Sequence, residues 1–177
     1  MFYKMIFTII VFFIAINASA NIKDLKTFEA SFTQSIKSIN DKIIEYKGKI
    51  FIKSSGKILW KYETPIEKNV YINNDFAIVD EPELEQVIYT QLQNEINVIE
   101  LLRTSKKINE TDFITNIDGT DYLIQTLNNS NKIKQIKYTD KLDNSVEIRF
   151  ENQITNQEIS NDIFKFTVPS HYDIIRK

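Results

Sequence analysis

The sequence predicts a mainly β protein with a small helical content. Apolar and polar residues alternate along short segments such as Ser145 to Glu151, and this period of two is typical of strands with one buried face. Polar stretches such as 128–131 and 140–144 separate these segments and predict turns. One amphipathic segment near residues 97–103 has a helical period instead. Short alternating strands joined by polar turns favour an antiparallel meander.

The first predicted element after residue 21 is a short helix over residues 22–28. Leu25 and Phe28 would share one face of it, and Asp24 near its start suits the positive end of the helix dipole. Residues 28–39 fit two structures, because their apolar side chains recur at helical spacing and also alternate in part as in a strand. The residues alone favour neither structure.

The remaining elements have mostly the period of strands. Around the only tryptophan, Ile58, Trp60 and Tyr62 share one strand face, and the charged residues Lys57, Lys61 and Glu63 lie on the other. Thr64-Pro65 ends the strand because proline has no N–H for the ladder. The segments predicted as strands are 46–53, 57–64, 70–72, 76–78, 122–127, 133–139, 145–151 and 164–168, with a hairpin turn at Asn73-Asn74.

One helix interrupts the predicted meander. Asn97 is a good N-cap, with Glu100 three residues later as its capping-box partner. Val98, Leu101 and Leu102 would then line one face. Such a helix either packs on the sheet as a plain core helix or lies over an opening, and composition alone favours the core helix.

The first twenty residues have the pattern of a cleavable secretory signal. Lys4 precedes an uncharged apolar run from Met5 to Ile16, and Ala18-Ser19-Ala20 forms a small-residue cleavage site. The alternative is an uncleaved anchor, but the run is short for a membrane span. We therefore expect residues 1–20 to be removed and residues 21–177 to form a single domain in the periplasm. The chain has no cysteine, which excludes disulfides and the lipid-bearing cysteine of a bacterial lipoprotein.

No pattern in the sequence predicts catalysis, a cofactor or a metal site. The three glycines are isolated and make no phosphate-binding loop. The only histidine, His171, is expected to be a surface residue. The acidic cluster Asp80, Glu81, Glu83 and Glu85 lacks a calcium-loop pattern and is expected to be a solvated loop and strand edge. The net charge of −2 gives no indication of nucleic-acid binding.

Several segments, taken in order, carry a family resemblance. Phe32-Thr33-Gln34, Gly48-Lys49-Ile50, Trp60-Lys61-Tyr62 with Pro65, Pro82 with Gln86-Val87, and Phe164-Lys165-Phe166 with Pro169 match short motifs in sequence order. Each motif is weak alone. Taken together, these motifs mean that the sequence resembles the periplasmic outer-membrane lipoprotein carriers, the LolA family, over nearly the whole chain beyond the signal. The resemblance also favours a strand beginning near Ala30.

The sequence departs from the family pattern near the tryptophan and around Pro82. The family has an arginine a few residues before the tryptophan that helps to hold a lid, and Ser54 occupies that position here. Ile58 replaces the family's phenylalanine, and Asp80 replaces an aromatic residue. These changes do not alter the fold prediction. At the lid-contact position, however, Ser54 offers a single short hydrogen-bond donor where the family has an arginine. We therefore expect a looser lid, or a substitute donor such as Lys53 or Lys57.

The resemblance implies a strongly curved antiparallel sheet, an incomplete β-barrel, with short helices forming a lid over a hydrophobic cavity. It further implies a monomeric carrier of acylated lipoproteins, loaded by an inner-membrane ABC-type lipoprotein-releasing complex and unloaded by an outer-membrane lipoprotein receptor. The cavity residues we expect are Ile50, Ile52, Ile58, Trp60, Tyr62, Val70 and Ile72, called here the apolar stripe. The lid residues we expect are Leu25, Phe28, Val98, Leu101 and Leu102.

Three other functions fit parts of the sequence less well. A generic periplasmic binder of free lipid or other apolar small molecules would have the same periodicity, and only its bound ligand distinguishes it. An envelope-stress regulator on a similar domain carries a second domain, which we do not expect here. An enzyme would need a constellation of close polar side chains, and the sequence singles out none.

Overall fold

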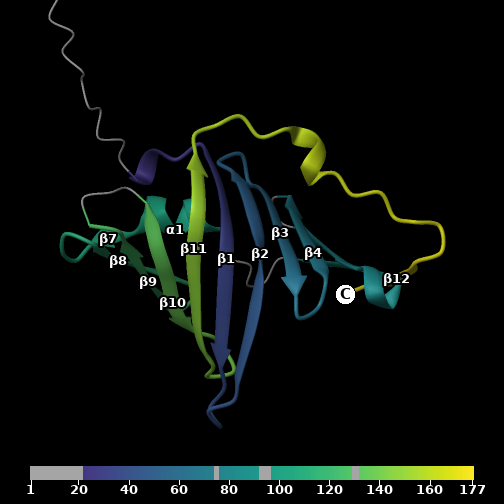
Figure 1. Cartoon of the computed structure of the whole chain (residues 1–177), viewed down its shortest axis with the longest axis horizontal. Helices are drawn as coiled ribbons and strands as arrows, with labels where there is room; N and C mark the ends of the chain where they lie inside the picture. The colour runs from purple at the N-terminus through teal and green to yellow at the C-terminus, as the bar shows by residue number, and fades with distance from the viewer. Residues whose placement is uncertain (1–21, 74–75, 92–96, 129–131) are drawn as a thin grey trace, which may run out of the picture.

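The computed structural model describes residues 22–73, 76–91, 97–128 and 132–177. Within these ranges the chain forms one open sheet of twelve strands, one α-helix and three short 3-10 helices (Figure 1). The sheet is strongly curved, and α1 lies behind β10 and β11 in the view of Figure 1. The mainly β prediction is therefore confirmed. The predicted signal peptide, residues 1–20, lies outside the described residues.

The strands follow one another across the sheet as antiparallel neighbours, except that β12 pairs in parallel with β6. The order across the sheet is β12-β6-β5-β4-β3-β2-β1-β11-β10-β9-β8-β7. The strands are β1 (Thr27–Lys37), β2 (Ile43–Lys53), β3 (Lys57–Thr64), β4 (Lys68–Asn73), β5 (Phe76–Glu81), β6 (Gln86–Gln91), β7 (Lys106–Lys107), β8 (Asp112–Ile117), β9 (Thr120–Thr126), β10 (Ile133–Thr139), β11 (Ser145–Thr155) and β12 (Asp173–Arg176). The helices are η1 (Ile22–Asp24), η2 (Pro82–Leu84), α1 (Val98–Thr104) and η3 (Asn161–Phe164).

The start of the domain differs from the sequence prediction. The helix expected over residues 22–28 is only η1, and β1 already begins at Thr27. Phe28 is therefore a strand residue, paired with Ile52 of β2, rather than a helical lid residue. The eleven residues of β1 pair along their length with β2, and this long-range pairing outweighs the helical spacing of the apolar residues.

The largest buried cluster lies on the concave face of the sheet. Alternate residues of β1, β2, β3, β4, β9, β10 and β11 point to this face, and the buried side chains of α1 join them. On β11, for example, Val146, Ile148 and Phe150 are buried whereas Glu147 and Arg149 face outward. This alternation of buried and outward residues along β11 matches the period of two seen in the sequence.

Gly48 lets two central strands approach closely. It lies on β2, where its partner across the ladder is Tyr62 of β3. A Cβ atom at this position would overlap the carbonyl oxygen of Lys61 and lie 3.0 Å from Cα of Tyr62. Only glycine therefore fits here, beside a register shift between Lys47 and Gly48 that bends the pair.

The C-terminal segment also differs from the prediction. A strand was expected over residues 164–168, but residues 161–164 form η3, residues 165–169 are irregular, and the last strand is β12. The ring of Phe166 packs on Tyr71 of β4, with 5.3 Å between centroids. Because Tyr71 lies between Val70 and Ile72 on its strand, it points to the convex face, so this segment covers the outside of the sheet. Figure 1 shows it leading to β12 at the sheet edge.

Candidate functional site

The apolar stripe lies on three adjacent strands and faces the concave side. Cross-strand pairs bring its members together: Ile50 opposes Trp60, which opposes Val70, and Ile52 opposes Ile58, which opposes Ile72. Six of the seven residues are at most 4% exposed, and Tyr62 at the end is half-buried. The sequence pattern therefore placed all seven residues on one face correctly.

Helix α1 covers the concave face with four buried residues. Val98, Ile99, Leu101 and Leu102 belong to the same buried cluster as the stripe, and Leu25 beside η1 joins them. The Oδ1 atom of Asn97 accepts a hydrogen bond from the backbone N–H of Glu100 at 3.1 Å, which confirms the predicted N-cap. The helix contacts η1, β8 and β2. The lid residues expected from the sequence are thus brought together with the stripe, except that Phe28 reaches the cluster from β1.

Few polar contacts join α1 to the rest of the domain in the described part of the chain. The Nζ atom of Lys23 in η1 donates to the carbonyl oxygen of Ser105, directly after α1, at 2.7 Å. The hydroxyls of Thr104 and Thr115 lie 2.9 Å apart and connect the helix to β8. A seven-residue helix is marginal alone, so packing and these contacts hold it in place.

Ser54 makes no side-chain hydrogen bond to α1 within the described residues. It lies in the exposed β2–β3 turn, and its backbone N–H donates to the carbonyl oxygen of Lys26 at 2.7 Å. Lys53, suggested as a substitute donor, instead donates to Asn161 at 2.8 Å and lies over the ring of Phe164. The donor that reaches the end of α1 is Lys23, which sequence reasoning missed.

Aromatic side chains surround one end of the stripe. The ring of Phe32 meets Trp60 edge to face at 5.0 Å between centroids and Tyr62 at 5.2 Å. Tyr46 continues the group with a centroid distance of 5.8 Å to Tyr62, and Lys68 lies over the Tyr62 ring. Within the described residues the buried Nε1 of Trp60 has no hydrogen-bond partner.

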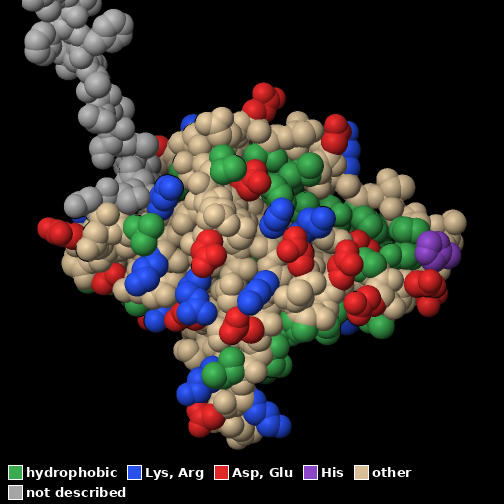
Figure 2. Space-filling view, in the orientation of Figure 1, with side chains coloured by type: hydrophobic (Ala, Val, Ile, Leu, Met, Phe, Trp, Pro, Cys, Tyr) green, Lys and Arg blue, Asp and Glu red, His purple; other side chains and the backbone are tan. Residues whose placement is uncertain are grey.

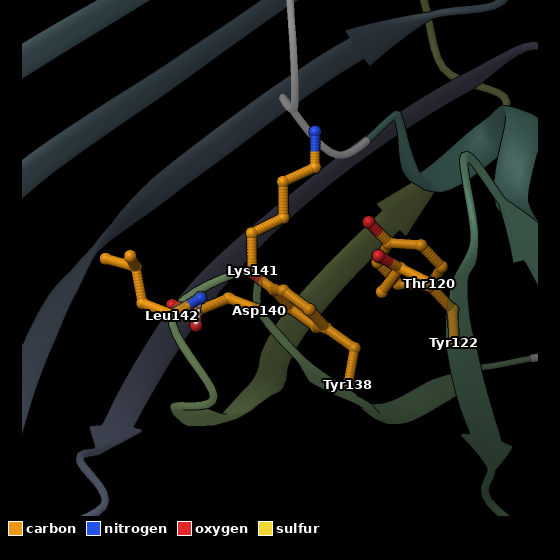
Figure 3. Close-up of a pocket in the computed structure, with 6 residues that line it drawn as sticks. All are labelled: Thr120, Tyr122, Tyr138, Asp140, Lys141 and Leu142. Carbon is orange, nitrogen blue, oxygen red and sulfur yellow. Dashed lines mark hydrogen bonds between the residues drawn. The ribbon is translucent and has the colours of Figure 1, made fainter.

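A second feature that the sequence did not reveal is a pocket beside the tilted, contacting rings of Tyr122 and Tyr138. Figure 3 shows the two rings together, with Leu142 to one side and Lys141 extending away from them. The ring centroids are 4.9 Å apart, and both residues pack against the main buried cluster. Burial, and then the nearby Asp118 carboxylate, raise the pKa of Tyr122 above its ordinary value. The pocket residues are Thr120, Tyr122, Tyr138, Asp140, Lys141 and Leu142.

The acidic cluster is partly buried, which corrects the expectation of a solvated edge. Asp80 is 6% exposed and accepts a hydrogen bond from Nδ2 of Asn69 at 2.9 Å. Glu81 accepts one from Gln86. In the described part of the chain, no three or more metal-ligating side chains are close enough to hold an ion, and no helix is long and apolar enough to cross a membrane.

The sequence is similar to known proteins over most of the chain. The sequence profile described as "Outer membrane lipoprotein carrier protein LolA" matches residues 23–123. The outer-membrane lipoprotein carrier protein of Campylobacter jejuni is 36% identical over 170 residues, covering 96% of this chain and 98% of the relative. This chain belongs to the LolA family.

A second relative supports the family assignment, and a solved structure shares the fold. The outer-membrane lipoprotein carrier protein of Wolinella succinogenes is 35% identical and covers 90% of this chain and 92% of its own. A LolA superfamily protein from Nitrosomonas europaea has a TM-score of 0.51 at 10% identity, over 81% of this chain and 91% of that one. The LolA family resemblance seen in the sequence motifs is therefore confirmed, and the structural likeness shows the shared fold.

Figure 2 shows the outer surface of this LolA family protein. Lysine, arginine and acidic side chains are mixed across it without a large field of one sign. Apolar side chains appear between them in scattered groups, and His171 lies at the surface near the C-terminal segment. The apolar stripe does not reach this surface, since it faces the concave side beneath α1.

Proposed function

We propose that this protein is a periplasmic carrier that binds the acyl chains of lipoproteins released from the inner membrane and delivers them to the outer membrane. The observation that carries the proposal is the continuous apolar cluster between a curved sheet and one short helix. The names of the relatives support the same cargo. The chain catalyses no covalent step in this proposal and uses no cofactor.

The free-energy cost of moving α1 off the sheet is similar in size to the gain from burying one acyl chain. Exposing the four buried side chains of α1 to water would cost about 6–12 kcal/mol, at about 1.5–3 kcal/mol each. Burying an acyl chain of about 15 methylenes gains about 12 kcal/mol, at about 0.8 kcal/mol per methylene. The helix is therefore expected to stay closed without cargo and to move aside when an acyl chain takes its place on the stripe.

The site in this proposal consists of the stripe as cavity lining and of α1 with Leu25 as lid. Phe28 serves as part of the lining rather than the lid, because it belongs to β1. Ser54 remains a lid-contact position only through the η1–β1 junction, where its backbone binds Lys26. The contact between Lys23 and Ser105 takes the role expected of the missing arginine, since it joins η1 to the end of the lid helix.

The partners follow from the direction of transport. An acylated lipoprotein with two or three chains does not cross an aqueous compartment unaided, so loading requires an energy source at the inner membrane and unloading requires an acceptor at the outer membrane. We assign these roles to an ABC-type lipoprotein-releasing complex and an outer-membrane lipoprotein receptor, with the carrier acting as a monomer. Nucleic acid has no part in it.

The periplasmic location rests on the first twenty residues. Secretion and cleavage after Ala20 would yield a mature single domain of residues 21–177. N-terminal sequencing of protein released by osmotic shock is expected to begin at Asn21. Membrane-bound protein that retains Met1 would contradict this processing.

Binding to a defined lipopeptide tests the function. A diacylated lipopeptide is expected to bind one to one and to increase hydrogen exchange across α1. The same peptide without acyl chains is expected not to bind measurably and to leave the exchange unchanged. The alternative, a binder of free lipid or other apolar small molecules, would be favoured if free fatty acid bound as well as the lipopeptide. Absence of binding to both ligands would contradict the carrier function.

A further inference from the structure

One buried donor in the candidate cavity has no partner. The Nε1 atom of Trp60 is buried, and no acceptor within hydrogen-bond distance is found in the parts of the chain that the structure describes. The two other such atoms, Oδ1 of Asn69 and Oδ1 of Asp80, belong to one hydrogen-bonded pair on the convex side of the sheet. Trp60 is therefore the donor that remains on the face where cargo is proposed to bind.

The surroundings of the indole are apolar. Phe32 and Tyr62 present their rings to it, and its cross-strand neighbours are Ile50 and Val70. An internal water would need two to four polar partners, and the Tyr62 hydroxyl is the single polar side-chain group among these four neighbours. Leaving a buried N–H without an acceptor costs about 1–3 kcal/mol, whereas a phenylalanine would fill an apolar site without that cost.

We propose that the Trp60 N–H donates a hydrogen bond to a carbonyl oxygen at the head of a cargo acyl chain, an ester or amide oxygen. This inference rests on the proposed carrier function. An alkyl chain has no acceptor, so apolar contact with the stripe cannot distinguish an acylated lipoprotein from other apolar molecules. A single donor in a water-free cavity makes that distinction, because its bond to a carbonyl has no competing water. Trp60 is then a specificity-determining residue for the acyl linkage.

The chain offers a direct spectroscopic test, because Trp60 is its only tryptophan. The indole N–H gives one assignable cross-peak in a proton–nitrogen correlation spectrum. We expect this peak to move downfield when a diacylated lipopeptide with ester linkages binds. The ether-linked analogue of the same chain length lacks the carbonyl oxygens and is expected to bind about tenfold more weakly without the downfield shift.

Two variants separate the hydrogen bond from apolar packing. Trp60→Phe removes the donor and keeps an aromatic ring, so it is expected to bind the ester and ether ligands with equal affinity. Phe32→Leu trims an adjacent ring without removing a donor, and it is expected to weaken both ligands while retaining the tenfold preference for the ester. Urea unfolding of each variant shows whether it is folded under the binding conditions.

The results for Trp60→Phe and for the unaltered protein decide whether the indole hydrogen bond exists. An unchanged ester preference in folded Trp60→Phe, or an indole shift of equal size with both ligands, would overturn the hydrogen bond. If Trp60→Phe does not fold, the hydrogen bond is tested on the unaltered protein alone, by the shift of its indole N–H peak and by its preference for the ester ligand. Failure of the unaltered protein to bind either ligand would contradict the proposed function itself, which is a different result from equal binding of both.

Discussion

Replacing Lys23 by methionine is expected to loosen α1. The ammonium of Lys23 donates to the carbonyl oxygen of Ser105 at 2.7 Å, at the negative end of the helix. Methionine keeps most of the aliphatic side chain and removes the charged donor. A hydrogen bond from a charged group contributes about 1.5–3 kcal/mol, and the part-buried position of Lys23 favours the lower end.

The expected loss of about 1.5 kcal/mol raises the open population of α1 by slightly more than about tenfold. Hydrogen exchange of the α1 amides measures this population directly, for example at Leu101, whose N–H donates to Asn97 at 2.9 Å. Exchange there should be about tenfold faster in Lys23→Met, while the amides of the central strands β1 and β2 should exchange as before.

A matched control removes the same charge nearby. Lys26 is exposed, and its hydrogen bond to Asn156 is made by the backbone N–H, so Lys26→Met leaves the Lys23 contact in place. We expect α1 exchange in this control to equal that of the unaltered protein. Equal exchange in Lys23→Met and Lys26→Met would refute the role of Lys23 in holding the helix.

Three further substitutions test the packing and the cavity. Gly48→Ala is expected to destabilise the domain by about 3 kcal/mol in urea unfolding, because its Cβ overlaps a β3 carbonyl; an unchanged midpoint would contradict the close approach. Asn69→Leu should cost about 2 kcal/mol by leaving the buried Asp80 carboxylate without its donor, and the double change with Asp80→Leu should recover most of it. Ile52→Glu places a charge in the stripe and should weaken lipopeptide binding at least tenfold, whereas Phe51→Glu on the opposite face should not; equal effects would exclude the stripe as the site.

The sequence predicted those parts of the fold that depend on local patterns. Alternation around Trp60 gave the correct face for the stripe, Thr64 is the last residue of β3, and Asn97 is the N-cap of α1. These features depend on side-chain periodicity, on the missing N–H of proline, and on an N-cap side chain that accepts a hydrogen bond from a backbone N–H three residues later. Each is a property of neighbouring residues, so one sequence is sufficient to read it.

The features that sequence reasoning missed depend on residues far apart in the chain. Lys23 and Ser105 are separated by 82 positions, and no local pattern indicates that their elements meet. Phe166 occupies an alternating apolar run, but no neighbouring strand pairs with it, and its ring packs on Tyr71 instead. Asp80 was expected in solvent because its sequence neighbours are acidic, although its burial results from Asn69 on the adjacent strand.

The central claim is that the apolar cluster exists to hold the acyl chains of lipoproteins. Mass spectrometry of the species bound to this protein, isolated from the envelope of its own cell, tests that claim most directly. We predict acylated lipoproteins or their lipidated N-terminal peptides, bound one per carrier and lost from Ile52→Glu. Recovery of free lipid or another apolar small molecule alone, at the same stoichiometry, would contradict the claim.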